Sequence, residues 1–149
     1  APPSHGPRRP SPDPDPMPDG LDLDWQGGVP VSRRFGDPFF SREGGAAEAA
    51  HVFLEGTGMM GRLRPGVTVL ELGFGTGLNA LVTLRALREA AFRGPLRFVS
   101  LERFPLAPAD RARALAAFPD LAPEAAELLA ALRAPGPWRL GPLVLEVLE

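Results

Sequence analysis

The sequence predicts an α/β fold in which helices join parallel strands. Short apolar runs that suit buried strands occur at residues 67–72, 96–101 and 143–148. Segments with helical spacing of apolar residues lie between them, at 78–92, 108–118 and 123–132. Strands that alternate with helices in this way form a parallel sheet with right-handed crossover connections.

The first strand and the first helix of this region carry the clearest patterns. The run 67–72 is almost continuously apolar, with Glu71 as its charged exception. In the following helix, Leu81, Leu84 and Leu87 share one face, and the pair Gly94-Pro95 stops the pattern. The third strand ends just before Glu149, where a complete doubly wound sheet would continue for several more strands.

Two smaller elements precede the alternating region. Leu21, Leu23 and Trp25 alternate with aspartates and are followed by two glycines, which predicts a hairpin that returns through residues 29–33. Alanines at helical spacing predict a helix over 43–54. We therefore divide the chain into a disordered, proline-rich tail at 1–20, a hairpin and helix at 21–66, and the first half of the alternating α/β domain at 67–149.

Composition narrows the classes of function. A chain of 149 residues that is 44% hydrophobic can build one core. The chain has no cysteine and only two isolated histidines, so we expect no metal site. A net charge of −2 argues against a protein that coats nucleic acid. No run approaches the ~20 apolar residues that span a bilayer, so we expect a soluble, cytoplasmic protein without membrane partners.

The most informative segment is the turn between the first strand and its helix, Glu71-Leu72-Gly73-Phe74-Gly75-Thr76-Gly77-Leu78-Asn79. Glycines here allow a tight bend and a close approach to a ligand, while the helix offers unpaired N–H groups. The segment predicts a site for a cofactor that carries a nucleoside. A tight turn without any ligand is the simpler alternative.

Spacing separates two cofactor classes. The dinucleotide pattern G-x-G-x-x-G would place its third glycine at position 78, which is Leu78, whereas the glycine stands at Gly77. Glu71 would lie poorly beside a pyrophosphate but suits the cationic amino group of a methionine moiety. Glu102 ends the second strand, where an acidic side chain can accept hydrogen bonds from ribose hydroxyls, although a carboxylate at a strand end is at least as often exposed to solvent without a ligand. S-adenosylmethionine therefore fits better, and an NAD-linked oxidoreductase is the alternative.

Several segments together resemble one specific family. They are Val29-Pro30-Val31-Ser32-Arg33, Phe35-Gly36-Asp37-Pro38-Phe39-Phe40-Ser41, Glu48 with His51-Val52-Phe53-Leu54 and Gly56, the glycine turn, and Leu101-Glu102-Arg103-Phe104-Pro105. They are similar to the methyltransferase domain of MnmC and to stand-alone MnmD, which methylate the 5-aminomethyl group of wobble (2-thio)uridine in tRNA. The resemblance implies the N-terminal part of a Rossmann-like class I methyltransferase fold and a tRNA partner.

The resemblance also implies a set of site residues. Glu71, Gly73, Gly75, Gly77 and Glu102 would hold S-adenosylmethionine, with Phe74, Thr76 and Asn79 lining the same pocket. We name no catalytic residue, because the family's remaining motifs are expected beyond residue 149. The oxidoreductase domain of bifunctional members is also absent from this chain. A non-catalytic fragment of the enzyme is therefore a further alternative.

Other candidates have simpler structural interpretations. His51 stands next to Val52 in a helical pattern, so we expect a packed or partly exposed histidine rather than a general base. Phe39 and Phe40 could approach the substrate base or the cofactor, but aromatic pairs in a compact domain usually belong to the core.

Overall fold

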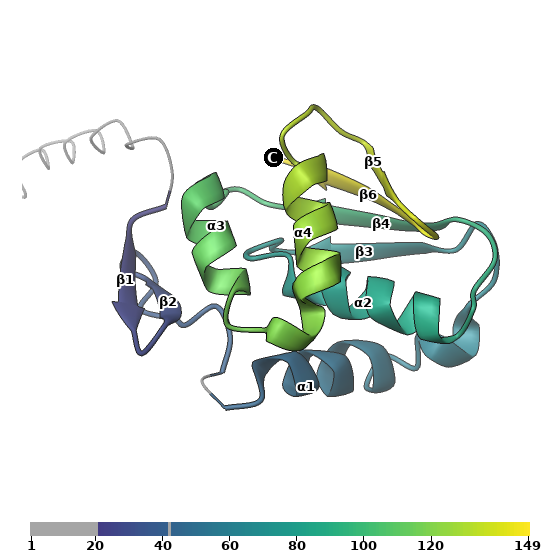
Figure 1. Cartoon of the computed structure of the whole chain (residues 1–149), viewed down its shortest axis with the longest axis horizontal. Coiled ribbons are helices and arrows are strands. Elements are labelled where there is room, and N and C mark those ends of the chain that lie inside the picture. Colours follow the sequence, from purple (N-terminus) through teal and green to yellow (C-terminus); the bar gives the residue numbers. More distant parts are fainter. Residues whose placement is uncertain (1–20, 42) are drawn as a thin grey trace, which may run out of the picture.

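The computed structural model describes residues 21–41 and 43–149, so the predicted disordered tail at 1–20 lies outside the described residues. A four-stranded sheet forms the centre, with strand order β3-β4-β6-β5 (Figure 1). Its strands are β3 (Thr68–Leu72), β4 (Leu96–Leu101), β5 (Trp138–Leu140) and β6 (Leu143–Leu148). β3, β4 and β6 are parallel, which confirms the predicted parallel arrangement, and β5 is antiparallel to β6.

Helices connect and cover these strands. They are α1 (Gly45–Ala49), α2 (Leu78–Glu89), α3 (Pro108–Leu115) and α4 (Ala122–Ala131). α1 continues directly into the π-helical segment η1 (Ala50–Glu55), and short 3₁₀ turns cover Met60–Arg62 and Pro119–Leu121. The helix predicted at 43–54 is therefore two joined segments with different hydrogen-bond patterns.

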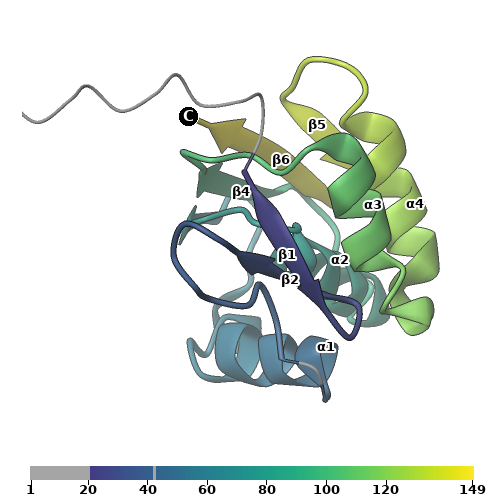
Figure 2. The ribbon, with the colours of Figure 1, turned by 90° about the vertical axis from the view of Figure 1, so that its left-hand side faces the viewer.

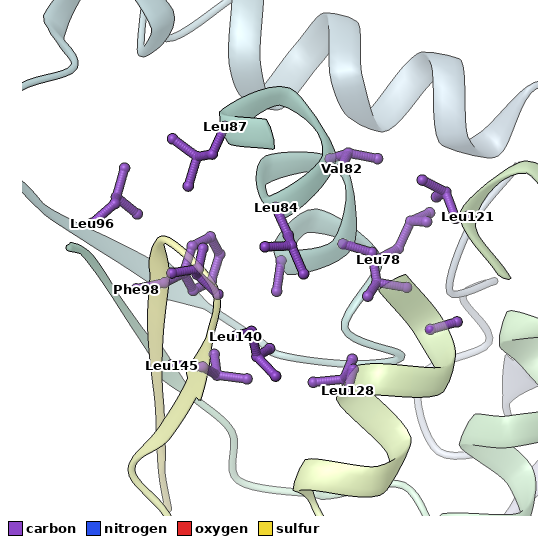
Figure 3. Packing of buried hydrophobic residues seen from close by; sticks show 14 of the residues in the cluster. Leu78, Val82, Leu84, Leu87, Leu96, Phe98, Leu121, Leu128, Leu140 and Leu145 are labelled. Carbon is purple, nitrogen blue, oxygen red and sulfur yellow. The ribbon is translucent and has the colours of Figure 1, made fainter. Parts of the chain in front are cut away.

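The core lies between α2, α4 and one face of the sheet. Leu84 and Leu87 of α2 are fully buried and point toward Phe98 and Leu145 of the central strands (Figure 3). Leu128 of α4 closes the same cluster from the other side. The leucine face predicted for the helix 78–92 is the face that packs on the sheet, and burial of such side chains stabilises the fold by about 2 kcal/mol each.

The predicted hairpin is present as β1 (Leu23–Gln26) and β2 (Val29–Ser32), paired in antiparallel register. It packs beside α3 rather than joining the main sheet (Figure 2). The described chain therefore consists of a central sheet with helices on one face and a small hairpin at the end where the parallel strands finish.

Two predicted helices end earlier than their apolar patterns suggested. α2 ends at Glu89, because Ala91 adopts a left-handed conformation with φ 48° and no helix continues through it. α3 ends at Leu115, and Phe118, with φ −119° and ψ 73°, is outside the helical region directly before Pro119, because a following proline disfavours a helical conformation.

The sequence analysis missed β5. The strand is only three residues long and turns back into β6 through Gly141, whose φ of 54° suits a tight reversal, and Pro142. Leu140 and Leu143 then face each other across the turn. A run this short carries too little period-2 pattern to predict a strand.

The opposite face of the sheet carries exposed apolar side chains. Leu70 and Leu72 of β3 are 64% and 80% exposed, and Leu101 and Leu148 continue the same face at 40% and 42%. Within the described residues, β3 pairs only with β4, so its outer edge retains free backbone groups.

Candidate functional site

The glycine turn joins the end of β3 to the start of α2. Gly73, Gly75 and Gly77 all have positive φ, at 89°, 53° and 89°. Side chains rarely tolerate this backbone region, so the three glycines are a geometric requirement of the bend. Gly73 N–H donates to Leu101 O at 2.7 Å, which ties the start of the turn to the end of β4.

Glu102 holds the turn from the neighbouring strand end. One carboxylate oxygen accepts from Gly75 N–H at 2.9 Å, and the other accepts from Phe104 N–H at 2.7 Å. The Glu102 backbone N–H in turn donates to Leu148 O at 2.7 Å. This bond fixes the backbone position, directly after β4, from which the Glu102 side chain projects. The carboxylate is partly exposed and lies directly beside the glycine turn.

Glu71 lies deeper than Glu102. Its side chain is buried, with one oxygen accepting from Asn79 Nδ2 at 2.8 Å and the other from Ser100 Oγ at 2.7 Å. Burial raises the pKa of the Glu71 carboxyl above its ordinary value; the two hydrogen bonds oppose this shift, and the charge of Glu102 adds to it. Two acidic groups therefore influence each other across the turn.

A pocket of about 760 Å³ opens at this end of the sheet, a size in the range of cofactor sites. One wall is the glycine turn with Glu102. The opposite wall comes from the segment that precedes α1 and from the face of α1 and η1. The second wall includes Asp37, Pro38, Phe39, Phe40, Ser41, Gly45, Glu48, Ala49, Val52 and Phe53.

Sequence comparison decides which family this arrangement represents. The chain is 44% identical over 117 residues to the tRNA 5-methylaminomethyl-2-thiouridine biosynthesis bifunctional protein MnmC of Marinobacter nauticus. It is 46% identical over 127 residues to the MnmC of Ectopseudomonas mendocina. These matches cover 72% and 79% of the chain. The chain belongs to the MnmC family.

The match covers only part of those relatives. The chain spans 18% of the length of the Marinobacter nauticus MnmC and 19% of the Ectopseudomonas mendocina MnmC. The crystal structure of MNMC2 from Aquifex aeolicus superposes with a TM-score of 0.57 over 90% of this chain and 44% of that one, at 24% identity. This likeness shows that the chain has the MNMC2-like fold, in agreement with the predicted Rossmann-like class. No family model matches the chain.

Six of the eight predicted site residues line the pocket of this MnmC family member: Gly73, Phe74, Gly75, Thr76, Asn79 and Glu102. Glu71 and Gly77 do not. Glu71 lies behind Asn79 and reaches the pocket only through that hydrogen bond. A Cβ at Gly77 would lie 2.9 Å from Leu128 Cδ2 and 3.0 Å from Phe74 Cζ, so this glycine allows the close packing of α4 against the turn.

Sequence reasoning missed other residues around the site. Phe39, for which we preferred a place in the core over one near the substrate or cofactor, lies in the pocket wall, with Cδ1 3.2 Å from where a Gly75 side chain would begin. Phe40 also lines the pocket, and its half-buried ring packs against the core, 4.7 Å from the ring of Phe118. Ser100 lies opposite Glu71 in the register of β3 and β4. Its contact with Glu71 can be predicted only when the alignment of these two strands is known.

The other features considered in the sequence analysis lie outside the pocket or are not found in the described residues. His51 is exposed and lies 2.7 Å from Glu55 on the same helical segment, in agreement with the structural interpretation. The helices of the described residues are all too short or too polar to cross a bilayer. Nor do residues 21–41 and 43–149 contain a cluster of His, Asp or Glu that could hold a metal ion.

Proposed function

We propose that the pocket binds S-adenosylmethionine and that the chain is the cofactor-binding part of an enzyme that methylates tRNA. The observation that carries this proposal is the placement of Glu102 beside the glycine turn, at the carboxyl end of β4 and at the mouth of the pocket. In α/β sheets, ligands bind in the crevice outside the carboxyl ends of parallel strands.

Glu102 has the chemistry to hold a ribose. Each of its oxygens accepts one backbone N–H and retains a further lone pair for a hydroxyl donor. The turn contributes the first N–H groups of α2, which have no partner within the helix. Asn79 projects from the first turn of α2 into the same pocket, with its amide held by Glu71.

The charges favour a cationic ligand end over a diphosphate. Glu71 and Glu102 already repel each other across the turn, so a pyrophosphate would add negative charge at the same place. An α-ammonium or a sulfonium would relieve that repulsion. This supports S-adenosylmethionine over NAD, in addition to the spacing of Gly77.

We further propose that the methyl acceptor is the 5-aminomethyl group of wobble (2-thio)uridine in tRNA, on the strength of the family assignment. When bound, S-adenosylmethionine supplies an electrophilic methyl group on sulfur. The residues of this chain would bind and orient that group, while Phe39 and Phe53 give the opposite wall an apolar surface. A cytoplasmic location, and an oxidoreductase domain in the parent protein, belong to the same proposal.

The test combines binding with transfer. The chain is titrated with S-adenosylmethionine, then incubated with it and with tRNA that carries 5-aminomethyl-2-thiouridine at the wobble position, and the nucleosides are analysed by mass spectrometry. We expect binding and the gain of one methyl group at that nucleoside. Binding without transfer would favour the non-catalytic alternative, and binding of NAD alone would contradict the proposal.

A further inference from the structure

Arg111 is a buried arginine beside the glycine turn. It projects from the first half of α3, and only 8% of its surface is exposed. α3 follows the loop after β4, and its Arg111 side chain contacts the turn at Phe74 and Gly75. The sequence does not indicate that Arg111 is buried, because helical spacing predicts that the buried face of α3 consists of apolar side chains.

The Arg111 guanidinium meets two consecutive residues of the turn. Its Nη2 donates to Gly75 O at 3.4 Å, a long hydrogen bond. Its central carbon lies 5.2 Å from the centre of the Phe74 ring, within the range of a cation–π contact. Gly75 is therefore held at both of its backbone polar groups, by Glu102 at N–H and by Arg111 at the carbonyl oxygen.

Simple packing does not account for a guanidinium in this place. Arg111 Nε is buried and has no hydrogen-bond partner among the described residues. Burial lowers the pKa of Arg111, and only the charge of Glu102 opposes that shift. An apolar side chain of similar length would fill the space without the desolvation cost. The contacts to Phe74 and Gly75 are what the guanidinium adds.

We propose that Arg111 is a positioning residue that holds the glycine turn in the conformation required for ligand binding. The inference rests on the proposed function, since that function makes the turn the cofactor-binding element. Arg111 itself does not line the pocket and acts through Gly75 and Phe74. It secures the carbonyl side of the turn, while Glu102 secures the amide side.

The test compares the full chain with Arg111→Met and Arg111→Lys by amide hydrogen exchange without ligand. Methionine keeps the length of the side chain and removes its donors, whereas lysine keeps the charge and loses the planar fork. The matched control is Arg113→Met, because Arg113 lies on the same helix but stacks on Trp25, 3.9 Å from its ring centre. Core amides at Leu84 and Phe98 report general loss of stability.

We expect Arg111→Met to raise the exchange rate of the Gly75 amide about tenfold relative to the core amides, the effect of one hydrogen bond to a charged group. Arg111→Lys should give a smaller rise, and Arg113→Met none. If Arg111→Met does not fold, Arg111→Lys decides. Unchanged relative exchange at Gly75 in a folded Arg111 variant would overturn the proposal, as would loss of folding in both variants.

A calorimetric titration of the same variants keeps the two proposals separate. Affinity for S-adenosylmethionine should fall about tenfold in Arg111→Met and remain unchanged in Arg113→Met. One outcome would separate the proposals: faster exchange at Gly75 in Arg111→Met, but no binding of S-adenosylmethionine by the unsubstituted chain. This outcome would support the role of Arg111 in holding the turn and would refute the proposed cofactor.

Discussion

The backbone N–H of Gly75 donates to the carboxylate of Glu102 at 2.9 Å, although the two residues stand 27 positions apart. This bond joins the loop after β3 to the loop after β4, at the edge where the pocket opens. Glu102 therefore has two roles in our account. It shapes the glycine turn, and it offers its remaining lone pairs to a ligand.

Replacing Glu102 by glutamine tests both roles. Each carboxylate oxygen accepts a backbone N–H, so the amide nitrogen of Gln would face one of these donors and lose a hydrogen bond. We expect the affinity for S-adenosylmethionine, measured by calorimetry, to fall by about tenfold to a hundredfold.

Glu146→Gln is the control for that change. Glu146 lies on β6 and pairs with Arg97 at 2.6 Å on the sheet face away from the helices. Its substitution should leave the affinity unchanged. An equal loss of affinity in both variants would indicate a general effect of charge and count against a ribose contact at Glu102.

Gly77→Ala tests the packing of the turn. Residue 77 has a left-handed backbone conformation, with φ 89°, which alanine rarely adopts. The added methyl group would also lie 2.9 Å from Leu128 Cδ2 and 3.0 Å from Phe74 Cζ. Gly58 also has a positive φ, of 63°, but an added Cβ there meets nothing within 4 Å. Urea titration should show Gly77→Ala to be the more destabilised by about 1–3 kcal/mol, the cost of overpacking. Equal losses would show that backbone strain alone matters.

Glu71 predicts a pH dependence of stability. Its folded-state pKa is raised, chiefly by burial, so the folded protein binds more protons than the unfolded one above the ordinary value of 4.5. The free energy of unfolding should therefore decrease as the pH rises from 4.5 through the raised pKa. Glu71→Gln, which can keep hydrogen bonds to Asn79 and Ser100, should remove this contribution and stabilise the chain at neutral pH.

The control for the pH experiment is Glu89→Gln, at an exposed position with a side chain 67% accessible. Its stability curve should follow that of the unsubstituted chain. A Glu71→Gln variant that loses stability at neutral pH would show that the ionised carboxylate is favoured in the fold.

The exposed face of β3 predicts self-association. Leu72 is 80% exposed and lies on a strand whose outer edge is unpaired within the described residues. Sedimentation velocity over a range of protein concentrations should show less association for Leu72→Gln than for the unsubstituted chain. Met60→Gln, at a position 37% exposed outside the sheet, is the control. Equal association in all three proteins would contradict this role of β3.

Local patterns predicted most of the elements. The hairpin, the three parallel strands and α2 follow from period-2 or period-3.6 spacing, and the structure confirms them. Helix ends were less accurate, because left-handed Ala91 and the constraint before Pro119 act on single residues. The division at residues 20 and 66 stays a prediction.

The site was predictable only in part. Five of the six predicted residues that line the pocket, Gly73, Phe74, Gly75, Thr76 and Asn79, stand in one turn, so the sequence displays them together. In the sequence, Glu71 and Glu102 have similar positions, because each is an acidic residue at the end of a predicted strand. Strand alternation, however, places Glu71 on the helix-covered face with Val69, whereas Glu102 lies beyond the last residue of β4. Arg111 and Phe39 reach the turn only through tertiary packing, which no local pattern encodes.

Calorimetric titration of the unsubstituted chain, with S-adenosylmethionine in one experiment and NAD in another, is the sharpest test of the proposed cofactor. We expect saturable binding of one S-adenosylmethionine per chain, weakened by Glu102→Gln and not by Glu146→Gln. Binding of NAD with no response to S-adenosylmethionine would contradict it, and so would S-adenosylmethionine binding that is indifferent to Glu102.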